Sequence, residues 1–261
     1  MNNFLKKNKS VLLNIFYPLL ALGVVLAIWS VAAEVTNKPL LLPSVRVVAE
    51  KFGKLLAQVS FWGSIGTTLL RTLETFLLAL VIAFVFAILG TFWSQLNRVL
   101  SPIITILRAA PTMAVILLST LWLEYDKSPI LIGFLISFPL LYASIYSAFS
   151  GVDKKLLEMA KVYKISPLDK AVSIYLPSVL PSVLDSVKSI ISLTLKVVIA
   201  AEVIAQTKNS IGIEMMKSNL VFDIDVLIAW TIIAVVLSFM LEFFVLGLKK
   251  IVGVKYGYNT K

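Results

Sequence analysis

Lys196 and Glu202 interrupt a long apolar run that begins near residue 178. A charge inside a bilayer is costly, so charged side chains within such runs are functional candidates, and both residues are candidates for a polar path through the membrane or for its gate. Lys196 has no partner at helical spacing, so it requires a polar cavity, a second protomer or an acid from another helix, such as Glu242. Glu202 fits two alternatives, which are a gate contact across a dimer and a solvated helix end.

Arg108 and Pro111 stand in another apolar run, 101–123. Arg108 can line a path for an anionic substrate, but it is only about two turns into the run, so its side chain can also extend to the membrane surface. Pro111 removes one backbone donor and is expected to kink the helix. The kink serves either packing or a translocation path, where cavity water satisfies the freed carbonyl groups.

Four further charges in the apolar runs form two pairs at helical spacing. Arg71 and Glu74 are three residues apart, as are Asp185 and Lys188. Residues at this spacing share one face of a helix, so each pair can form an internal ion pair. We interpret both pairs as structural.

The sequence lacks the residues on which most catalytic and metal sites depend. It contains no cysteine and no histidine, no glycine-rich phosphate loop followed by lysine and a hydroxyl residue, and no T-V-G-Y-G filter. We therefore expect neither an enzyme nor a bound cofactor or metal in this chain. A membrane transferase would depend on unpaired intramembrane acids alone.

Composition places the chain in a membrane. Hydrophobic residues make up 59% of its 261 residues, charged residues only 15%, and the mean hydropathy is +0.95. These values predict an all-α polytopic membrane protein with a single domain, 1–261, and about six transmembrane helices. We expect spans near 11–33, 67–93, 101–123, 129–149, 178–206 and 226–248.

Lysine and arginine are distributed unevenly between the connections that this layout implies. Thirteen of the 24 fall on the side of both termini and of the loop 153–177, and seven fall on the other side. This bias places both termini, the tail 1–10 and that loop in the cytoplasm. It also explains the net charge of +10 without a nucleic-acid partner. The segment 43–60 is amphipathic and is expected to lie on the outer membrane surface, before a core at 65–250.

The loop 153–177 is polar and helical between apolar runs. Its first predicted helix has an apolar face of Leu156, Met159 or Ala160, and Tyr163, and a polar face of Lys154, Lys155, Glu158 and Lys161. Ser166, Pro167 and Asp169 form a start signal for a second helix. We expect this helix to end at Pro177, and the two helices to be joined by a bend at 164–166.

Glu158-Met159-Ala160 and the later Ile174-Tyr175-Leu176-Pro177 resemble the EAA loop of ABC importer permeases, E-A-A-x3-G-x9-I-x-L-P. The spacing from Glu158 to Pro177 fits without a gap, although Met159 replaces an alanine and Lys164 the usual glycine. Ser166-Pro167 can make the bend instead. The resemblance implies that the loop couples to an ATPase through Glu158, Met159, Ala160, Lys161, Tyr163, Lys164, Ser166, Leu176 and Pro177. The alternative for Glu158 is a surface ion pair with Lys155 or Lys161.

Other short motifs extend the resemblance over about residues 40 to 250, toward the nitrate, sulfonate and taurine branch of these permeases. They are Leu42-Pro43-Ser44, Arg71-Thr72-Leu73, Arg108-Ala109-Ala110-Pro111, Ala201-Glu202 and Ser210-Ile211-Gly212. The resemblance implies a bacterial cytoplasmic membrane, a second and usually identical protomer, two ATP-binding cassette subunits that hold ATP and Mg²⁺, and an extracytoplasmic substrate-binding protein. It implies a small solute, either nitrate-, sulfonate- or taurine-like or a heterocyclic vitamin precursor. The alternative function is an ion-coupled secondary transporter.

Overall fold

The computed structural model describes the backbone of residues 2–256 and the side chains of residues 16–251. Within this part of the chain all regular structure is helical. The helices are α1 (Asn2–Thr36), α2 (Val45–Leu56), α3 (Val59–Phe92), α4 (Ser94–Ala109), α5 (Thr112–Trp122), α6 (Ser128–Ser150), α7 (Lys154–Val162), α8 (Pro167–Lys170), α9 (Leu176–Ala205), α10 (Ile211–Leu220) and α11 (Ile224–Tyr256), and a π-helical turn, Ala171–Tyr175, joins α8 to α9. The predicted all-α class is confirmed.

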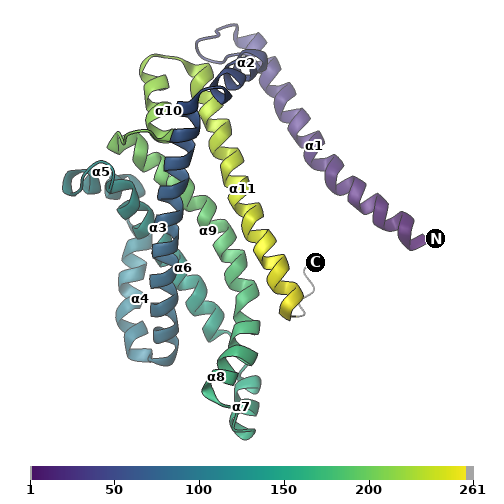
Figure 1. Cartoon of the computed structure of the whole chain (residues 1–261), viewed down its shortest axis with the longest axis vertical. Helices are drawn as coiled ribbons and strands as arrows, with labels where there is room; N and C mark the ends of the chain where they lie inside the picture. Colours follow the sequence, from purple (N-terminus) through teal and green to yellow (C-terminus); the bar gives the residue numbers. More distant parts are fainter. Residues whose placement is uncertain (1, 257–261) are drawn as a thin grey trace.

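Helices α3, α6, α9 and α11 form the bundle that carries the core (Figure 1). Small residues let these helices approach closely, as is typical of helix packing in membranes. Ala79, Ala83 and Ala87 of α3 are fully buried. A Cβ at Gly133 of α6 would lie only 2.6 Å from Thr75 Cγ2 on α3, so the α3–α6 contact requires glycine there.

Four helices with described side chains are long and apolar enough to cross a membrane, and a bent pair of helices makes a possible fifth span. The four lie in α1, α3, α6 and α11, and the pair is α4 with α5. Helix α9 is 30 residues long and carries Asp185, Lys188, Lys196 and Glu202. The polytopic membrane class is therefore confirmed, and the count of six spans stays a prediction.

The third predicted span breaks at Pro111, where we expected a kink within one helix. Helices α4 and α5 meet at an angle of 97°. Ala110 precedes a proline and is held in an extended conformation, with ψ at 131°, and Pro111 is extended as well, with ψ at 120°. Two successive extended residues end the first helix outright, because neither continues its turn.

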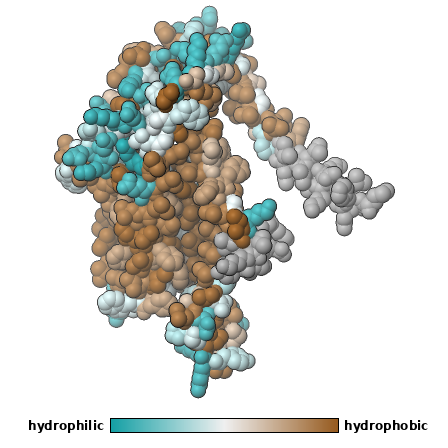
Figure 2. All heavy atoms as spheres, viewed as in Figure 1, coloured by the Kyte–Doolittle hydropathy of each residue, from teal (hydrophilic) through white to brown (hydrophobic). Residues whose placement is uncertain are grey.

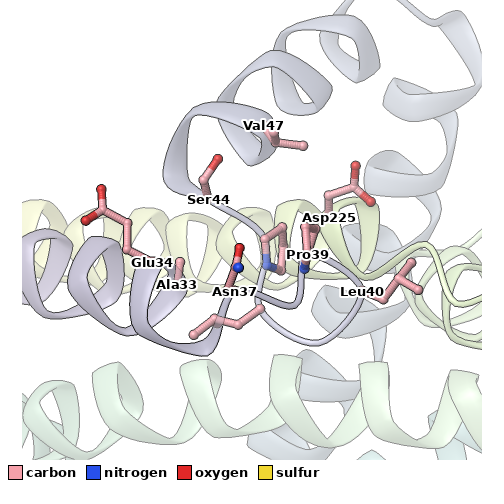
Figure 3. A pocket seen from close by; sticks show the side chains of 10 residues that line it. Ala33, Glu34, Asn37, Pro39, Leu40, Ser44, Val47 and Asp225 are labelled. Atoms are coloured by element: carbon pink, nitrogen blue, oxygen red, sulfur yellow. The ribbon is translucent and has the colours of Figure 1, made fainter.

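Helix α1 lies away from most of the bundle and packs near α2 (Figure 1). Trp29 Nε1 donates a hydrogen bond to the Pro43 carbonyl at 3.0 Å. The turn between α1 and α2 encloses a cavity of about 400 Å³, which Glu34, Asn37 and Asp225 line with polar groups (Figure 3). Helix α2 occupies most of the segment 43–60.

On the face seen in Figure 2, hydrophobic surface covers the middle of the bundle and hydrophilic surface gathers toward its two ends. One end carries α2 and α10, and the other carries α7 and α8 (Figure 1). The two polar ends are therefore separated by the length of the bundle.

Candidate functional site

Helix α7 begins with a side-chain cap and packs one narrow face on the bundle. Lys155 N donates to Asp153 Oδ1 at 2.9 Å, which satisfies one free amide of the first turn. Ala160 is 2% exposed, and Leu157 packs beside it against the core. Of the predicted apolar face of Leu156, Met159 or Ala160, and Tyr163, Ala160 is buried and the other three residues are exposed. The helix has apolar residues on two faces, so periodicity alone did not choose between them.

The bend between α7 and α8 is made at Lys164, and not by Ser166-Pro167 alone. Lys164 has φ at 50°, in the left-handed region. Its amide donates to Lys161 O at 3.1 Å, and Ile165 N donates to Ala160 O at 2.9 Å. This pair of bonds is the Schellman arrangement that ends many helices, usually with glycine at the left-handed position. Lysine thus adopts here the conformation that the family glycine would supply.

Ser166 starts α8. Its Oγ accepts from Asp169 N at 3.1 Å and donates to Asp169 Oδ2 at 2.7 Å, as the start signal predicted. The helix does not end at Pro177, which corrects our expectation. The backbone continues through the π-helical turn, where Leu176 N donates to Ala171 O, and enters α9 directly. Pro177 then falls in the first turn of α9, directly after the π-helical turn.

Tyr175 connects this loop to the bundle and was not among the predicted site residues. It is buried, with its ring 5.7 Å from Phe92 at the end of α3 and 5.9 Å from Phe149 on α6. Lys170 Nζ lies 5.8 Å from the same ring. The only sequence signal was its place inside the I-x-L-P motif. A displacement of α8 therefore reaches α3 and α6 through one side chain, and α9 through the backbone.

The outer surface of α7 and α8 is exposed and largely apolar. Its large hydrophobic residues are Leu156, Met159, Val162, Tyr163, Leu168 and Val172, with Val162 78% and Tyr163 75% exposed. Glu158, Lys161 and Lys164 are exposed beside them, whereas Leu176 and Pro177 are half-buried at the start of α9. Within the described part of the chain Glu158 has no ion pair, so the surface pair with Lys155 or Lys161 is absent.

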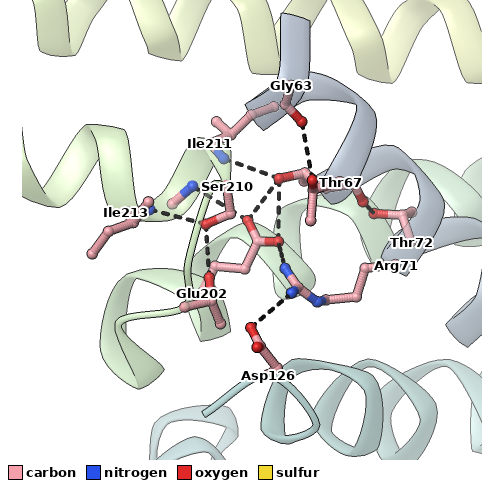
Figure 4. A network of polar contacts seen from close by, with 12 residues as sticks. Gly63, Thr67, Arg71, Thr72, Asp126, Glu202, Ser210, Ile211 and Ile213 are labelled. Atoms are coloured by element: carbon pink, nitrogen blue, oxygen red, sulfur yellow. Dashed lines mark hydrogen bonds and ion pairs between the residues drawn. The ribbon is translucent and has the colours of Figure 1, made fainter. Parts of the chain in front are cut away.

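The opposite end of the bundle holds a buried ion pair between Arg71 on α3 and Glu202 near the end of α9 (Figure 4). Glu202 is fully buried, and Arg71 is 8% exposed. The second guanidinium nitrogen binds Asp126 Oδ1, before α6, at 3.2 Å. Our expectation of an Arg71–Glu74 pair is wrong. Neither alternative for Glu202 holds, because its partner lies in the same chain and its carboxylate is not solvated.

Backbone amides from α10 complete this polar network. Thr68 Oγ1 donates to Glu202 Oε2 at 2.9 Å and accepts from Ile211 N at 3.0 Å. Gly212 N lies 3.3 Å from the same Oε2. A Cβ on Gly212 would stand 2.4 Å from Glu202 Cβ, so glycine permits this approach. The network therefore holds α3, α9 and α10 together.

The remaining charged candidates lie apart from this network. Asp185 pairs with Lys249 of α11 at 2.6 Å, and Lys188 lies 3.8 Å from Glu242, so the predicted Asp185–Lys188 pair is absent. Glu242 is thereby engaged and is not the partner of Lys196. Lys196 is exposed, as are Arg108 and Pro111 at the α4–α5 break. The structure does not gather the four candidate pathway residues into one cluster within a protomer.

The fold is that of an all-helical membrane protein with a broken helix and a short two-helix loop at one end. Residues 88–253 match the family described as binding-protein-dependent transport system inner membrane component, and the chain belongs to this family. It is thus an integral inner membrane protein and a transport permease.

Relatives over most of the chain agree with this family. The chain is 28% identical to a probable ABC transporter permease protein of Haemophilus influenzae, over 87% of this chain and 92% of the relative. It is 27% identical to the putative aliphatic sulfonates transport permease SsuC of Escherichia coli, over 84% and 83%. A solved amino acid ABC transporter shares the fold, with a TM-score of 0.63 at 14% identity over 77% of this chain and 96% of that one.

Proposed function

We propose that this chain is the permease subunit of an ATP-driven importer, in which a binding protein delivers a small solute and a separate ATPase supplies the energy. The observation that carries the proposal is the exposed apolar surface of α7 and α8, which is tied to the bundle through Tyr175 and Ala160. A soluble protein that docked on this surface would cover Leu156, Met159 and Tyr163. Burial of such side chains is the usual source of binding energy at an interface.

A charged residue lies beside this apolar docking surface. Glu158 stands exposed and unpaired at the same end, so a basic or hydrogen-bonding group of the ATPase can bind it. Movement of the ATPase pair then pushes α7, and the π-helical turn passes the displacement to α9 without a flexible break. The assembly contains two ATPase subunits, which hold ATP and Mg²⁺, and a second permease protomer.

The proposed orientation is set by the end of the molecule that bears α7 and α8. The α7–α8 loop and both termini are cytoplasmic, and α2 and α10 face the binding protein. The substrate is a small nitrate-, sulfonate- or taurine-like solute or a heterocyclic vitamin precursor, and the relationship to sulfonate permeases favours the first group.

Charge reversal at Glu158 tests the coupling role. Truncating one member of a buried interfacial charge pair costs about 2 to 5 kcal/mol of association free energy. An isolated surface ion pair contributes only about a few tenths of a kcal/mol. Glu158→Lys should therefore abolish ATP-driven uptake and coupled ATP hydrolysis, while the protein still inserts into the membrane.

The matched control is Gln95→Lys, which adds a lysine to an exposed position at the same end of the bundle but outside the loop. This variant should transport normally. Normal uptake by Glu158→Lys at normal expression would remove the loop as the coupling element and favour an ion-coupled secondary transporter.

A further inference from the structure

Helix α9 presents an exposed stripe in which every side chain except Leu193 is small or polar. It consists of Ser178, Ser182, Asp185, Ser189, Leu193, Lys196 and Ala200, spaced three or four residues apart on one face. The other exposed faces of the bundle carry large apolar residues such as Leu77 of α3 and Phe243 of α11. Because exposed charge is costly in hydrocarbon, this stripe is unsuited to lipid and faces water or a second protomer.

Lys196 lies close to mid-depth in the bundle. Thr194, two residues earlier, has its Oγ1 2.7 Å from Ser137 Oγ on α6. Ser137 is near the middle of the 23 residues of α6, which is one of the helices able to span a membrane. Leu195 and Val197 on either side of the lysine are buried, so only its own side chain emerges at this level.

No acid in the described part of the chain pairs with Lys196. By contrast, a carboxylate lies within 4 Å of Arg71 on α3, of Lys188 on α9 and of Lys249 on α11. An ammonium at mid-depth without such a partner favours a negatively charged ligand from outside the protomer.

An open surface groove of about 630 Å³ lies farther along α9 than Lys196, toward the end that bears α7. It lies between α6 and α9 and is lined by the hydroxyls of Ser144, Ser182, Ser186 and Ser189, with Leu140, Asp185 and Ile190. Ser189 is two helical turns, about 10 Å, from Lys196 on the same face. Asp185 is neutralised by Lys249, so the groove has hydroxyl donors and no free carboxylate of its own to repel an anion.

We infer that Lys196 is the residue that selects an anionic solute, and that the serine groove carries this solute onward to the cytoplasm. The ligand is a small oxyanion of the sulfonate type. Its oxygens accept from the ammonium at mid-depth and then from the serine hydroxyls. This inference rests on the proposed permease function and adds the side chain that recognises the substrate and the groove that carries it.

The test uses the full complex of permease, ATPase and binding protein in proteoliposomes. Uptake is measured for two anions, ethanesulfonate and nitrate, for the uncharged ethanesulfonamide and for the cation ethylammonium. We expect the wild type to take up an anion. Lys196→Gln should lower that uptake about tenfold or more, whereas Lys196→Arg retains most of it. ATP hydrolysis stimulated by the binding protein should stay within about twofold of wild type in both variants.

A matched control removes another lysine of α9 together with its acid. The double variant Lys188→Gln with Glu242→Gln leaves no unpaired charge and should transport normally. The inference is overturned if Lys196→Gln transports anions normally, or if it prevents assembly of the complex, which would make Lys196 the partner of an acid across an interface. Uptake of only the uncharged or cationic probe also overturns it and leaves the permease function standing. A wild-type complex with no ATP-dependent uptake of any probe also overturns the inference, and the permease function is tested separately by Glu158→Lys.

Discussion

Arg71 on α3 forms a buried ion pair with Glu202 on α9, 131 residues later in the chain. Removing one partner of such a pair leaves an uncompensated buried charge, at a cost of about 3 to 5 kcal/mol. Arg71→Ala and Glu202→Ala should therefore each destabilise the protein by this amount. Thermal unfolding of the detergent-solubilised protein measures the loss.

The double variant Arg71→Met with Glu202→Leu removes both charges and keeps side chains of similar size. Replacing a buried ion pair by apolar residues of similar size is often nearly neutral. This double variant should therefore be more stable than either single alanine variant. If it is as unstable as the singles, packing and not charge pairing explains their effect.

Lys164→Gly places glycine at a left-handed position that now holds lysine. A non-glycine residue in this conformation costs about 1 kcal/mol, so the substitution should stabilise the end of α7 and leave transport intact. Hydrogen exchange at the amide of Ile165, which donates to Ala160 O, should slow. Lys161→Gly, inside α7, provides the opposite control and should speed this exchange, because glycine costs about 1 kcal/mol in a helix. Faster exchange in both variants would contradict the Schellman assignment.

Gly133→Ala should destabilise the α3–α6 contact. Its Cβ would lie 2.6 Å from Thr75 Cγ2 and 3.1 Å from Val198 Cγ2, and overpacking of this kind costs about 1 to 3 kcal/mol. The control is Gly63→Ala on α3, where a Cβ meets nothing within 4 Å and the gain in helix propensity is up to about 1 kcal/mol. Unfolding temperatures that move in opposite directions would support the close approach, and equal shifts would argue against it.

The topology is tested with single cysteines, since the chain has none of its own. A cysteine at Lys161 should be labelled by a membrane-impermeant maleimide only from the cytoplasmic side, and one at Asn209 only from outside. Both positions are exposed, so the reagent can reach them. Reversed labelling would overturn the proposed orientation of the whole bundle.

Much of the site could be predicted from local sequence. The cap at Ser166 with Asp169 depends on residues three apart, and the spacing of Glu158 and Pro177 is fixed along the chain. The expected class, a polytopic helical membrane protein, follows from composition, because long apolar runs can satisfy their backbone groups in a bilayer only as helices or barrels. These features need no knowledge of which helices meet.

Ion-pair partners and packed faces were decided by tertiary structure. Arg71 has Glu74 at helical spacing, yet it binds Glu202, since the fold brings α9 and the start of α10 against α3 and no local pattern encodes this approach. Lys164 takes a left-handed conformation because the bonds from its own amide and that of Ile165 close the end of α7 while Ile165 packs on the core. Helix α7 has two apolar faces, and only the position of the bundle determined that Ala160 is buried and Tyr163 is exposed. The sequence by itself determined membrane class, helix starts and the coupling motif, whereas contacts between distant segments depend on the free energy of the whole packed bundle.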